Sequence, residues 1–356
     1  MRLPRSTTVP RPSPQVQRSR LRLGALCVIA ATVVLTGCGS GDDSSTPDVP
    51  TVTPASASPA PAGAAASPAG TVVATPARSR GLALSGDLVA VLDPAGTTVL
   101  RLRANDPTAA PQPVQTPALA RLIGSGDGAF LGVGPGVVVE VAGDGTVTTT
   151  EVDTNDPTAL ARTANGDVLV GTADGRVLVL DTDLSPVREI DGFVRVDDIT
   201  VAPDSADLSS EQVVVLDRAQ SSVTPINLTD GDLGPALRAG NGATNSTVDH
   251  FGRVLVANTR DGEIIGFFGS PLVMRFRYPV PGGPYAVDYD DERNLMWVST
   301  TANNEVVAYD LSGGEPAEMR RLQAVAQPDT IAVDDATGTV YVLSQRGGLQ
   351  IIGNGE

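Results

Sequence analysis

Residues 283–311 read GPYAVDYDDERNLMWVSTTANNEVVAYDL, and residues 328–353 read PDTIAVDDATGTVYVLSQRGGLQIIG. Each stretch contains an apolar run, a polar turn, a second run (WVST or YVLS), another turn and a third run. Apolar and polar side chains alternate in steps of two along these runs, which is typical of half-buried β-strands. The two stretches therefore predict antiparallel strands joined by short turns.

Five earlier segments align with the second runs of these two copies. They are LVAVLD from Leu88, AFLGVG from Ala129, DVLVGT from Asp167, QVVVLD from Gln212 and RVLVAN from Arg253. The copies recur at a period near 40 residues, because their first strands open at Leu82, Leu122, Leu160, Ile199, Ser246, Tyr285 and Ile331. An all-strand repeat of this period predicts a β-propeller with four strands per blade, and seven copies predict seven blades.

The third copy shows the expected blade most simply. Its hairpin turns are predicted at Asn165-Gly166 and Asp174-Gly175, because these residues tolerate the positive φ that two-residue turns require. Its four strands are predicted to begin at Ala159, Asp167, Arg176 and Pro186. Longer spacings place insertions at 203–211 in the fourth blade and at 313–319 in the sixth.

The last copy supplies only three strands and ends at Gly353. Residues 71–76, TVVATP, form an unassigned strand-like segment just before the first copy. We expect this N-terminal strand to become the outermost strand of the seventh blade, because pairing the chain ends removes an exposed sheet edge. The alternative is that 71–76 merely extends the segment before it. The predicted propeller thus covers residues 71–356.

The first 37 residues have the organisation of a secretion signal. A polar, Arg-containing stretch precedes an apolar run of about twelve residues at 23–34, shorter than the roughly 20 residues that cross a bilayer. Leu35-Thr36-Gly37-Cys38 follows and resembles a bacterial lipobox, in which the Cys receives diacylglycerol. We expect residues 1–37 to be a lipoprotein signal peptide and Cys38 to be lipidated. The alternative is an ordinary signal that ends in a chance Cys.

Residues 38–70 are predicted to form a disordered tether. They are rich in Pro, Ala, Ser, Thr and Gly, and such a segment buries too little apolar surface to offset its ordering entropy. Cys27 lies within the apolar run of the signal, so Cys38 alone would remain after cleavage and no intrachain disulfide could form. A lone Cys at this place favours acylation, with palmitate-type chains holding the protein at the outer side of the cytoplasmic membrane.

The charge of the chain bears on its partners. All 25 positively charged residues are Arg, and 41 Asp and Glu give a formal net charge of −16. Six of the arginines precede Gly24, so removal of the signal would make the protein still more acidic. So acidic a body repels nucleic acid, and we expect no nucleic-acid partner.

The WVST- and YVLS-like second strands resemble those of YVTN-type and NHL-type propellers, over residues 71–356. Together with LTGC and the Pro/Ala-rich tether, the whole chain is similar to actinobacterial lipoproteins of the LppL type. The resemblance implies an exported, membrane-anchored propeller and no particular activity. Ser246 and Thr247 depart from the usual apolar opening, which leaves the start of the fifth blade open by a residue or two.

Candidate ligand-binding residues follow from the propeller topology. The loops that lead into the innermost strands, and the turns between second and third strands, surround one end of the central channel, which is the usual ligand site. Polar residues there would suit a small polar or anionic ligand held by Arg. The alternative is a solvated rim of self-neutralising charges. The candidates are Arg80, Arg121, Asp198, Arg218, Asn245, Asn258, Arg260, Asn303, Asp329 and Arg346.

The sequence offers little for catalysis or for metals. His250, the only histidine, falls in a turn between first and second strands, which opens on the opposite face, so we name no catalytic residue. After cleavage of the signal the chain would offer one His and, once Cys38 is acylated, no free Cys, which gives little basis for a zinc or iron site, and we expect no cofactor. Calcium takes oxygen ligands and would be compatible with Asp198, Asn245, Asn303 and Asp329.

These observations favour a membrane-anchored, extracytoplasmic protein that binds or scaffolds. The partner would be a small polar ligand or an envelope protein, and the propeller is expected to be monomeric. Two alternatives stay open. A calcium-dependent, lactonase-like hydrolase of propeller type would use the acids and Asn at the channel, whereas a purely structural cell-envelope protein would bind no small molecule there.

Overall fold

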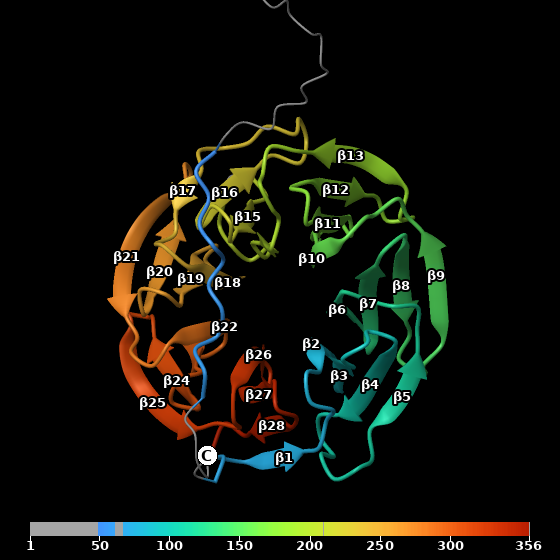
Figure 1. The fold of residues 1–356 in the computed structure, drawn as a ribbon, viewed down its shortest axis with the longest axis vertical. Helices are drawn as coiled ribbons and strands as arrows, with labels where there is room; N and C mark the ends of the chain where they lie inside the picture. Colours follow the sequence, from blue (N-terminus) through green and yellow to red (C-terminus); the bar gives the residue numbers. More distant parts are fainter. Residues whose placement is uncertain (1–48, 61–66, 209, 356) are drawn as a thin grey trace, which may run out of the picture. The chain divides into compact units, whose positions relative to one another are not determined.

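The computed structural model describes residues 49–60, 67–208 and 210–355. The predicted signal peptide, Cys38 and the first part of the predicted tether lie outside these residues. The propeller is built from seven four-stranded antiparallel sheets arranged in a ring (Figure 1). The predicted all-β, seven-bladed propeller is therefore confirmed. In the part of the chain that the structure describes, no helix is long and apolar enough to cross a membrane.

Each of the first three blades is a meander in which the chain runs from the inside of the ring outwards. Blade 1 consists of β2 (Arg80–Ser85), β3 (Leu88–Leu92), β4 (Thr98–Arg103) and β5 (Gln112–Gln115). Blade 2 consists of β6 (Arg121–Gly126), β7 (Ala129–Gly134), β8 (Val137–Val141) and β9 (Val147–Glu151). Blade 3 consists of β10 (Pro157–Arg162), β11 (Val168–Thr172), β12 (Val177–Leu180) and β13 (Pro186–Ile190).

The remaining blades follow the same course. Blade 4 consists of β14 (Asp198–Val201), β15 (Val213–Asp217), β16 (Ser222–Ile226) and β17 (Leu237–Arg238). Blade 5 consists of β18 (Ala243–Val248), β19 (Val254–Asn258), β20 (Glu263–Phe268) and β21 (Val273–Pro279). Blade 6 consists of β22 (Pro284–Asp290), β23 (Leu295–Thr300), β24 (Glu305–Asp310) and β25 (Ala317–Gln323). Blade 7 consists of β26 (Pro328–Asp334), β27 (Thr339–Ser344), β28 (Leu349–Ile352) and β1 (Thr71–Val73).

The ring closes through the N-terminal strand, as the sequence predicts. β1 pairs antiparallel with β28, with Thr71 opposite Ile351 and Val73 opposite Leu349. Figure 1 shows β1 in blue beside the C-terminal blade in red. Val73 is buried in the apolar cluster between blades 7 and 1. The strand therefore covers the edge of β28 and also adds to the core.

Local turn chemistry also agrees with the sequence. Gly166 and Gly175, at the two predicted hairpins of blade 3, have φ of +95° and +87°. The insertion at 203–211 joins β14 to β15, and the one at 313–319 lies where β24 leads into β25. Both insertions therefore lengthen connections and leave the four-stranded blades intact.

The hydrophobic core lies between the blades. Seven apolar clusters are found among the described residues, and each is formed by two neighbouring blades. Trp297, Tyr309 and Tyr341 are all at most 2% exposed within these clusters. Because every blade buries both faces, the second strands are nearly all apolar, which explains why they stand out in the sequence.

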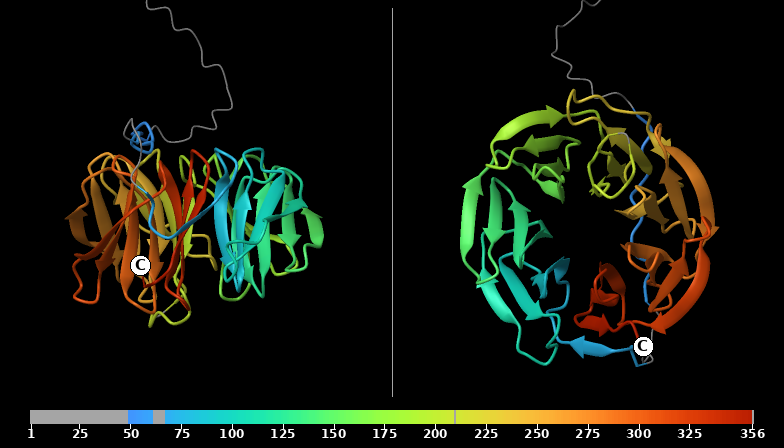
Figure 2. Two further views of the ribbon diagram at one scale, coloured as in Figure 1. Left: turned by 90° about the horizontal axis from the view of Figure 1, so that it is seen from below. Right: turned by 180° about the vertical axis from the view of Figure 1, so that it is seen from behind.

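The topology gives the ring two distinct faces. We call the upper face the side where the inner strands begin and where the turns between second and third strands lie. The lower face carries the turns between first and second strands. Residues 49–60 cross the upper face, as the blue segment over β18 and β22 shows in Figure 1 and at the top of the left panel of Figure 2. The described part of the predicted tether thus contacts the propeller; we call residues 49–60 the strap.

Candidate functional site

All ten candidate ligand-binding residues lie at the upper face. Arg80, Arg121 and Asp198 are the first residues of inner strands β2, β6 and β14. The others lie within the first three residues of inner strands, at the last residue of a second strand or just after one: Arg218, Asn245, Asn258, Arg260, Asn303, Asp329 and Arg346. The ring therefore brings to one face residues that are up to 266 positions apart in the chain. Their side chains nevertheless differ in what they contact.

Arg121 is the centre of a charged cluster inside the ring. Its exposed guanidinium donates a hydrogen bond only to the neighbouring Ala120 carbonyl, at 3.0 Å. Although the side chain is exposed, the surrounding blades displace part of the water around its guanidinium, which lowers its pKa, and attraction to Asp198 and Asp197 opposes that shift. Arg195 and Arg218 lie close enough that their positive charges lower it further. Three arginine side chains therefore lie close to one another inside the ring, and guanidinium groups form strong hydrogen bonds with anions.

The two carboxylates near Arg121 are occupied by other groups. Asp197 accepts hydrogen bonds from Arg195 Nε at 2.6 Å and from the Arg218 backbone N–H at 2.9 Å. Asp198 accepts bonds from the backbone N–H and the hydroxyl of Ser246, at 3.2 and 2.9 Å. Burial raises the pKa of Asp198, and these bonds only partly offset it. The carboxylates therefore leave the guanidinium of Arg121 without a direct ion pair in the described structure.

Arg218 and Arg260 face the strap. Arg218 donates to the carbonyl of Ala55 at 2.5 Å, and its Nε is buried without a partner among the described residues. Arg260 donates to the carbonyl of Thr53 at 2.6 Å. These two predicted ligand residues are therefore already binding a peptide, which belongs to the same chain.

Three of the candidates serve local structure. Asn258 is fully buried, donates to Asp261 and Glu263, and accepts from the backbone N–H of Gly242. Its role as a ligand residue stays a prediction, and in the described structure this side chain, with 0% exposure and three partners, holds the turn together. Asn245 and Asn303 likewise donate to neighbours in the described structure, to the Tyr285 carbonyl at 2.9 Å and to Glu305 at 3.4 Å.

The three remaining candidates, Asp329, Arg80 and Arg346, have fewer partners. Asp329 accepts a 2.5 Å bond from Gln345, and its other oxygen is buried without a partner among the described residues. Burial raises the pKa of Asp329 to about 6. Arg80 and Arg346 are exposed, and within the described ranges neither side chain has a hydrogen bond or ion pair.

The four residues compatible with calcium lie in four different blades, and each has a partner of its own. Asp198, Asn245, Asn303 and Asp329 bond to Ser246, the Tyr285 carbonyl, Glu305 and Gln345. Among the residues that the structure describes, no group of three or more His, Cys, Asp or Glu side chains is placed to hold a metal ion.

Three upper-face residues were not singled out from the sequence. Arg195 and Asp197 immediately precede Asp198, and Gln327 immediately precedes the inner strand β26. Gln327 bonds the strap twice, donating to the Ser58 carbonyl at 2.8 Å and accepting from the Ala60 N–H at 2.9 Å. Their position before an inner strand could have predicted that they lie at the upper face. No local sequence pattern could have predicted that Gln327 contacts the strap.

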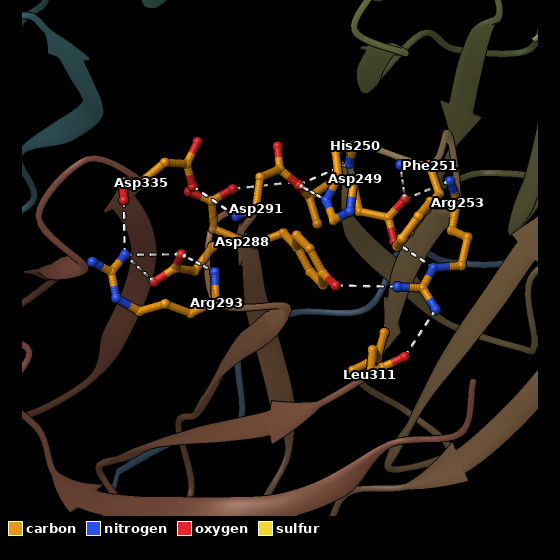
Figure 3. Close-up of polar contacts among 12 residues, drawn as sticks. Asp249, His250, Phe251, Arg253, Asp288, Asp291, Arg293, Leu311 and Asp335 are labelled. Atoms are coloured by element: carbon orange, nitrogen blue, oxygen red, sulfur yellow. Dashed lines mark hydrogen bonds and ion pairs between the residues drawn. The ribbon is translucent and has the colours of Figure 1, made fainter. Parts of the chain in front are cut away.

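The lower face carries a different kind of network, drawn in Figure 3. His250 lies in the turn between β18 and β19, as predicted, and contacts the carboxylate of Asp291 through both its backbone N–H and Nδ1, at 2.8 and 2.9 Å. The N–H of Asp291 in turn donates to the carboxylate of Asp335 at 2.8 Å. Equivalent turns of blades 5, 6 and 7 are thereby linked side by side.

Asp249 and Arg253 anchor the same network in blade 5. The carboxylate of Asp249 is fully buried, accepts the N–H groups of Phe251 and Arg253, and forms an ion pair with the Arg253 side chain. That guanidinium also donates to the carbonyl of Leu311 and the hydroxyl of Tyr289, at 3.2 and 3.1 Å. Nearly every donor and acceptor has a partner, so the arrangement is suited to joining blades.

Comparison with known proteins identifies the fold class. No family model matches this chain, and no curated protein matches its sequence. A streptogramin B lyase structure is similar at a TM-score of 0.65 and 16% identity, covering 80% of this chain and 98% of that one. Virginiamycin B lyase from Staphylococcus aureus in a catalytically inactive form with quinupristin matches at 0.62 and 13%, covering 79% and 99%. Kuenenia stuttgartiensis hydrazine synthase matches at 0.65 and 12%, covering 79% and 97%.

These likenesses define the chain as a seven-bladed β-propeller and carry no further than the fold. The resemblance to LppL-type lipoproteins stays a prediction.

Proposed function

We propose that the protein binds a small anionic ligand at the upper face of the propeller, and that Cys38 anchors it at the outer side of the cytoplasmic membrane. The observation that carries the ligand proposal is the cluster of Arg121, Arg195 and Arg218 inside the ring. Arg121 donates only to a backbone carbonyl, so its remaining N–H groups can bind a ligand. A guanidinium binds carboxylate and phosphate groups through paired hydrogen bonds.

The charge balance supports an anion in an otherwise acidic protein. The chain has a formal net charge of −16, which repels anions in general. Guanidinium groups without a carboxylate partner are therefore needed before an anion can bind, and Arg80 and Arg346 add two arginines on the same face whose side chains have no partner among the described residues. An anion would be attracted to these arginines and repelled by the acidic remainder of the surface.

The proposal is tested by titrating inorganic phosphate and succinate into the full chain by calorimetry. We expect saturable binding of at least one of these anions, and binding at least about tenfold weaker in Arg121→Gln, because a charged hydrogen bond contributes about 1.5–3 kcal/mol. Arg103→Gln is the matched control, since Arg103 lies on the lower side of blade 1 and pairs only with exposed Asp87. Equal affinity in wild type and Arg121→Gln would refute the site, and binding of neither anion would favour a purely structural role.

The anchoring proposal has a geometric consequence. The strap holds the chain at the upper face from Val52 onward, where the Val52 N–H donates to the Ala219 carbonyl at 2.7 Å. Val49 follows Cys38 by eleven positions, which can span at most about 40 Å. A lipid on Cys38 would thus hold the propeller within that length of chain from the bilayer surface.

Detergent-phase partitioning of cell extracts tests the anchor. We expect the wild-type protein in the detergent phase and Cys38→Ser in the aqueous phase, because one acylated Cys supplies the only proposed attachment. Incorporation of labelled palmitate into the wild type, but not into Cys38→Ser, is the second measurement. Partitioning of both proteins into the aqueous phase would contradict the proposal.

A hydrolase of the lactonase type is the second candidate. It is favoured by Asp329, whose pKa is raised to about 6 by burial and whose second carboxylate oxygen has no partner among the described residues. Three of the similar structures are lyases by name, although at 13–16% identity they support only the fold. Hydrolysis of a simple γ-lactone by the wild type, lost in Asp329→Asn with anion binding retained, would favour this candidate.

A further inference from the structure

The strap is held through its backbone. The carbonyls of Thr53, Ala55 and Ser58 accept hydrogen bonds from Arg260, Arg218 and Gln327. Its N–H groups at Val52 and Ala60 donate to the Ala219 carbonyl and to Gln327. The partners come from blades 4, 5 and 7, so the strap runs across the upper face. We call these partners, together with Gly242 and Gly283, the strap groove.

The side chains of the strap contribute little to this recognition. Residues 49–60 read VPTVTPASASPA and contain no charge. Thr51, Thr53, Pro54, Ser56 and Pro59 are exposed, whereas Ala55 is 6% exposed. The groove therefore binds the carbonyl groups of the strap. It selects mainly for an extended chain with a small residue at the position of Ala55.

Ala55 is the point where size matters. A Cβ placed on Gly242 would lie 3.0 Å from the Ala55 Cβ and 2.6 Å from the Arg260 Cβ, so the strap lies directly on the glycine backbone. Gly283 similarly lies against Ser58. Two glycines in the loops before inner strands thus make room for a peptide, and a long side chain at position 55 does not fit.

We propose that the strap groove is a peptide-binding surface that accepts, in exchange for the strap, an extended, uncharged, proline-containing segment of another polypeptide. Proline favours this role because it fixes an extended backbone and also holds the residue before it extended, and Thr53 and Ser58, whose carbonyls accept hydrogen bonds from the propeller, each precede a proline. When the strap leaves, Arg218, Arg260 and Gln327 lose their peptide partners, so a second peptide with the same backbone replaces those bonds. The strap groove shares Arg218 with the proposed anion site but extends beyond it. Peptide binding at the groove does not require that an anion binds.

The strap has a kinetic and thermodynamic advantage over any such partner. It is covalently linked to the propeller through residues 67–73, and a short linkage gives a local concentration in the millimolar range. A free peptide of equal intrinsic affinity would bind poorly while the strap is in place. The groove is therefore tested after the strap has been displaced within the full chain.

The first experiment replaces residues 49–60 by alternating Gly and Ser in the full chain and titrates a fluorescent VPTVTPASASPA peptide. We expect saturable binding that is at least about tenfold tighter than to the wild type, where the strap competes. A peptide with Ala55→Arg should lose at least about tenfold in affinity, and a peptide with Ser56→Arg should not, because position 56 is exposed. Absence of binding, or equal affinity of the two substituted peptides, would overturn the proposal.

A second pair of variants gives an answer even if the Gly/Ser chain fails to fold. Ala55→Arg and Ser56→Arg in the full chain each add one trypsin site to the strap. We expect Ala55→Arg to expel the strap, to be cut there at least about tenfold faster than Ser56→Arg, and to bind the native peptide. Equal cutting of both variants, or an expelled strap without peptide binding, would refute the peptide groove and would leave the phosphate titration unaffected.

Discussion

The two faces of the propeller treat their polar groups in opposite ways. On the lower face, His250, Asp291 and Asp335 form a continuous chain in which blade after blade supplies the acceptor for the preceding turn (Figure 3). On the upper face, Arg80 and Arg346 have no partner among the described residues, and Arg218 has an unpartnered buried Nε. Closed networks stabilise the ring, whereas groups without protein partners are available to ligands.

The largest effect is expected where the lower-face network is buried. Asp249→Ala should reduce the free energy of unfolding by about 3–5 kcal/mol, because it leaves the Arg253 guanidinium, only 13% exposed, without its carboxylate. Two backbone N–H groups also lose their acceptor. Denaturant unfolding measures the change.

Asp87→Ala is the matched control for that experiment. Asp87 also lies in a turn between first and second strands, but its ion pair with Arg103 is more than half exposed on both sides. We expect a loss below about 1 kcal/mol. A similar loss of unfolding free energy in Asp249→Ala and Asp87→Ala would mean that burial of the ion pair does not determine how much each turn stabilises the protein.

The next effect concerns pH and the inside of the ring. Asp288 accepts the Val333 N–H at 2.9 Å and the Thr247 hydroxyl at 3.1 Å, and burial raises its pKa to about 7. Because the folded pKa exceeds the unfolded value of about 3.8, this group favours folding below pH 4 and loses that contribution as pH rises to about 7.

Asp288→Asn should therefore be more stable than the wild type at pH 8, by about 1–2 kcal/mol, with little difference at pH 4. Melting temperatures measured from pH 4 to pH 8 would show the two curves separating toward higher pH. Parallel curves would contradict the assignment of the pH dependence to Asp288.

A smaller effect of the same sign is expected on the upper face. Burial raises the pKa of Asp329 to about 6, so its contribution to folding is lost between about pH 4 and pH 6. Asp329→Asn keeps the acceptor for Gln345 and should gain about 1 kcal/mol at pH 8. Loss of stability at pH 8 in this variant would instead indicate that the charged form is needed for folding.

The smallest effect on stability is expected at the centre of the proposed ligand site. Arg121→Gln should change the free energy of unfolding by less than about 0.5 kcal/mol, because its side chain is exposed and bonds only to Ala120. Chemical denaturation beside the anion titration gives both values. A large loss of stability would place Arg121 with the structural residues of the lower face.

Much of the architecture followed from local patterns. The seven LVAVLD-like runs, the Asn-Gly and Asp-Gly turns and the unpaired TVVATP strand predicted the blades and the closure of the ring. The upper-face position of residues such as Arg121 and Asp198 followed from strand order alone. The role of Asn258 could not be predicted, because its burial depends on Asp261, Glu263 and Gly242 closing around it.

The sequence by itself determined which segments are strands, how many blades they make and which residues lie at each end of the ring. These properties depend on side-chain alternation and on turn residues, and both act within about ten positions of the chain. Only the tertiary structure decided which polar groups are paired, and where the Pro/Ala/Ser-rich segment lies. The contacts of Ala55 with Arg218 and of Ala60 with Gln327 join positions 163 and 267 apart. Contacts at that distance form only once the ring has closed and leave no period in the sequence.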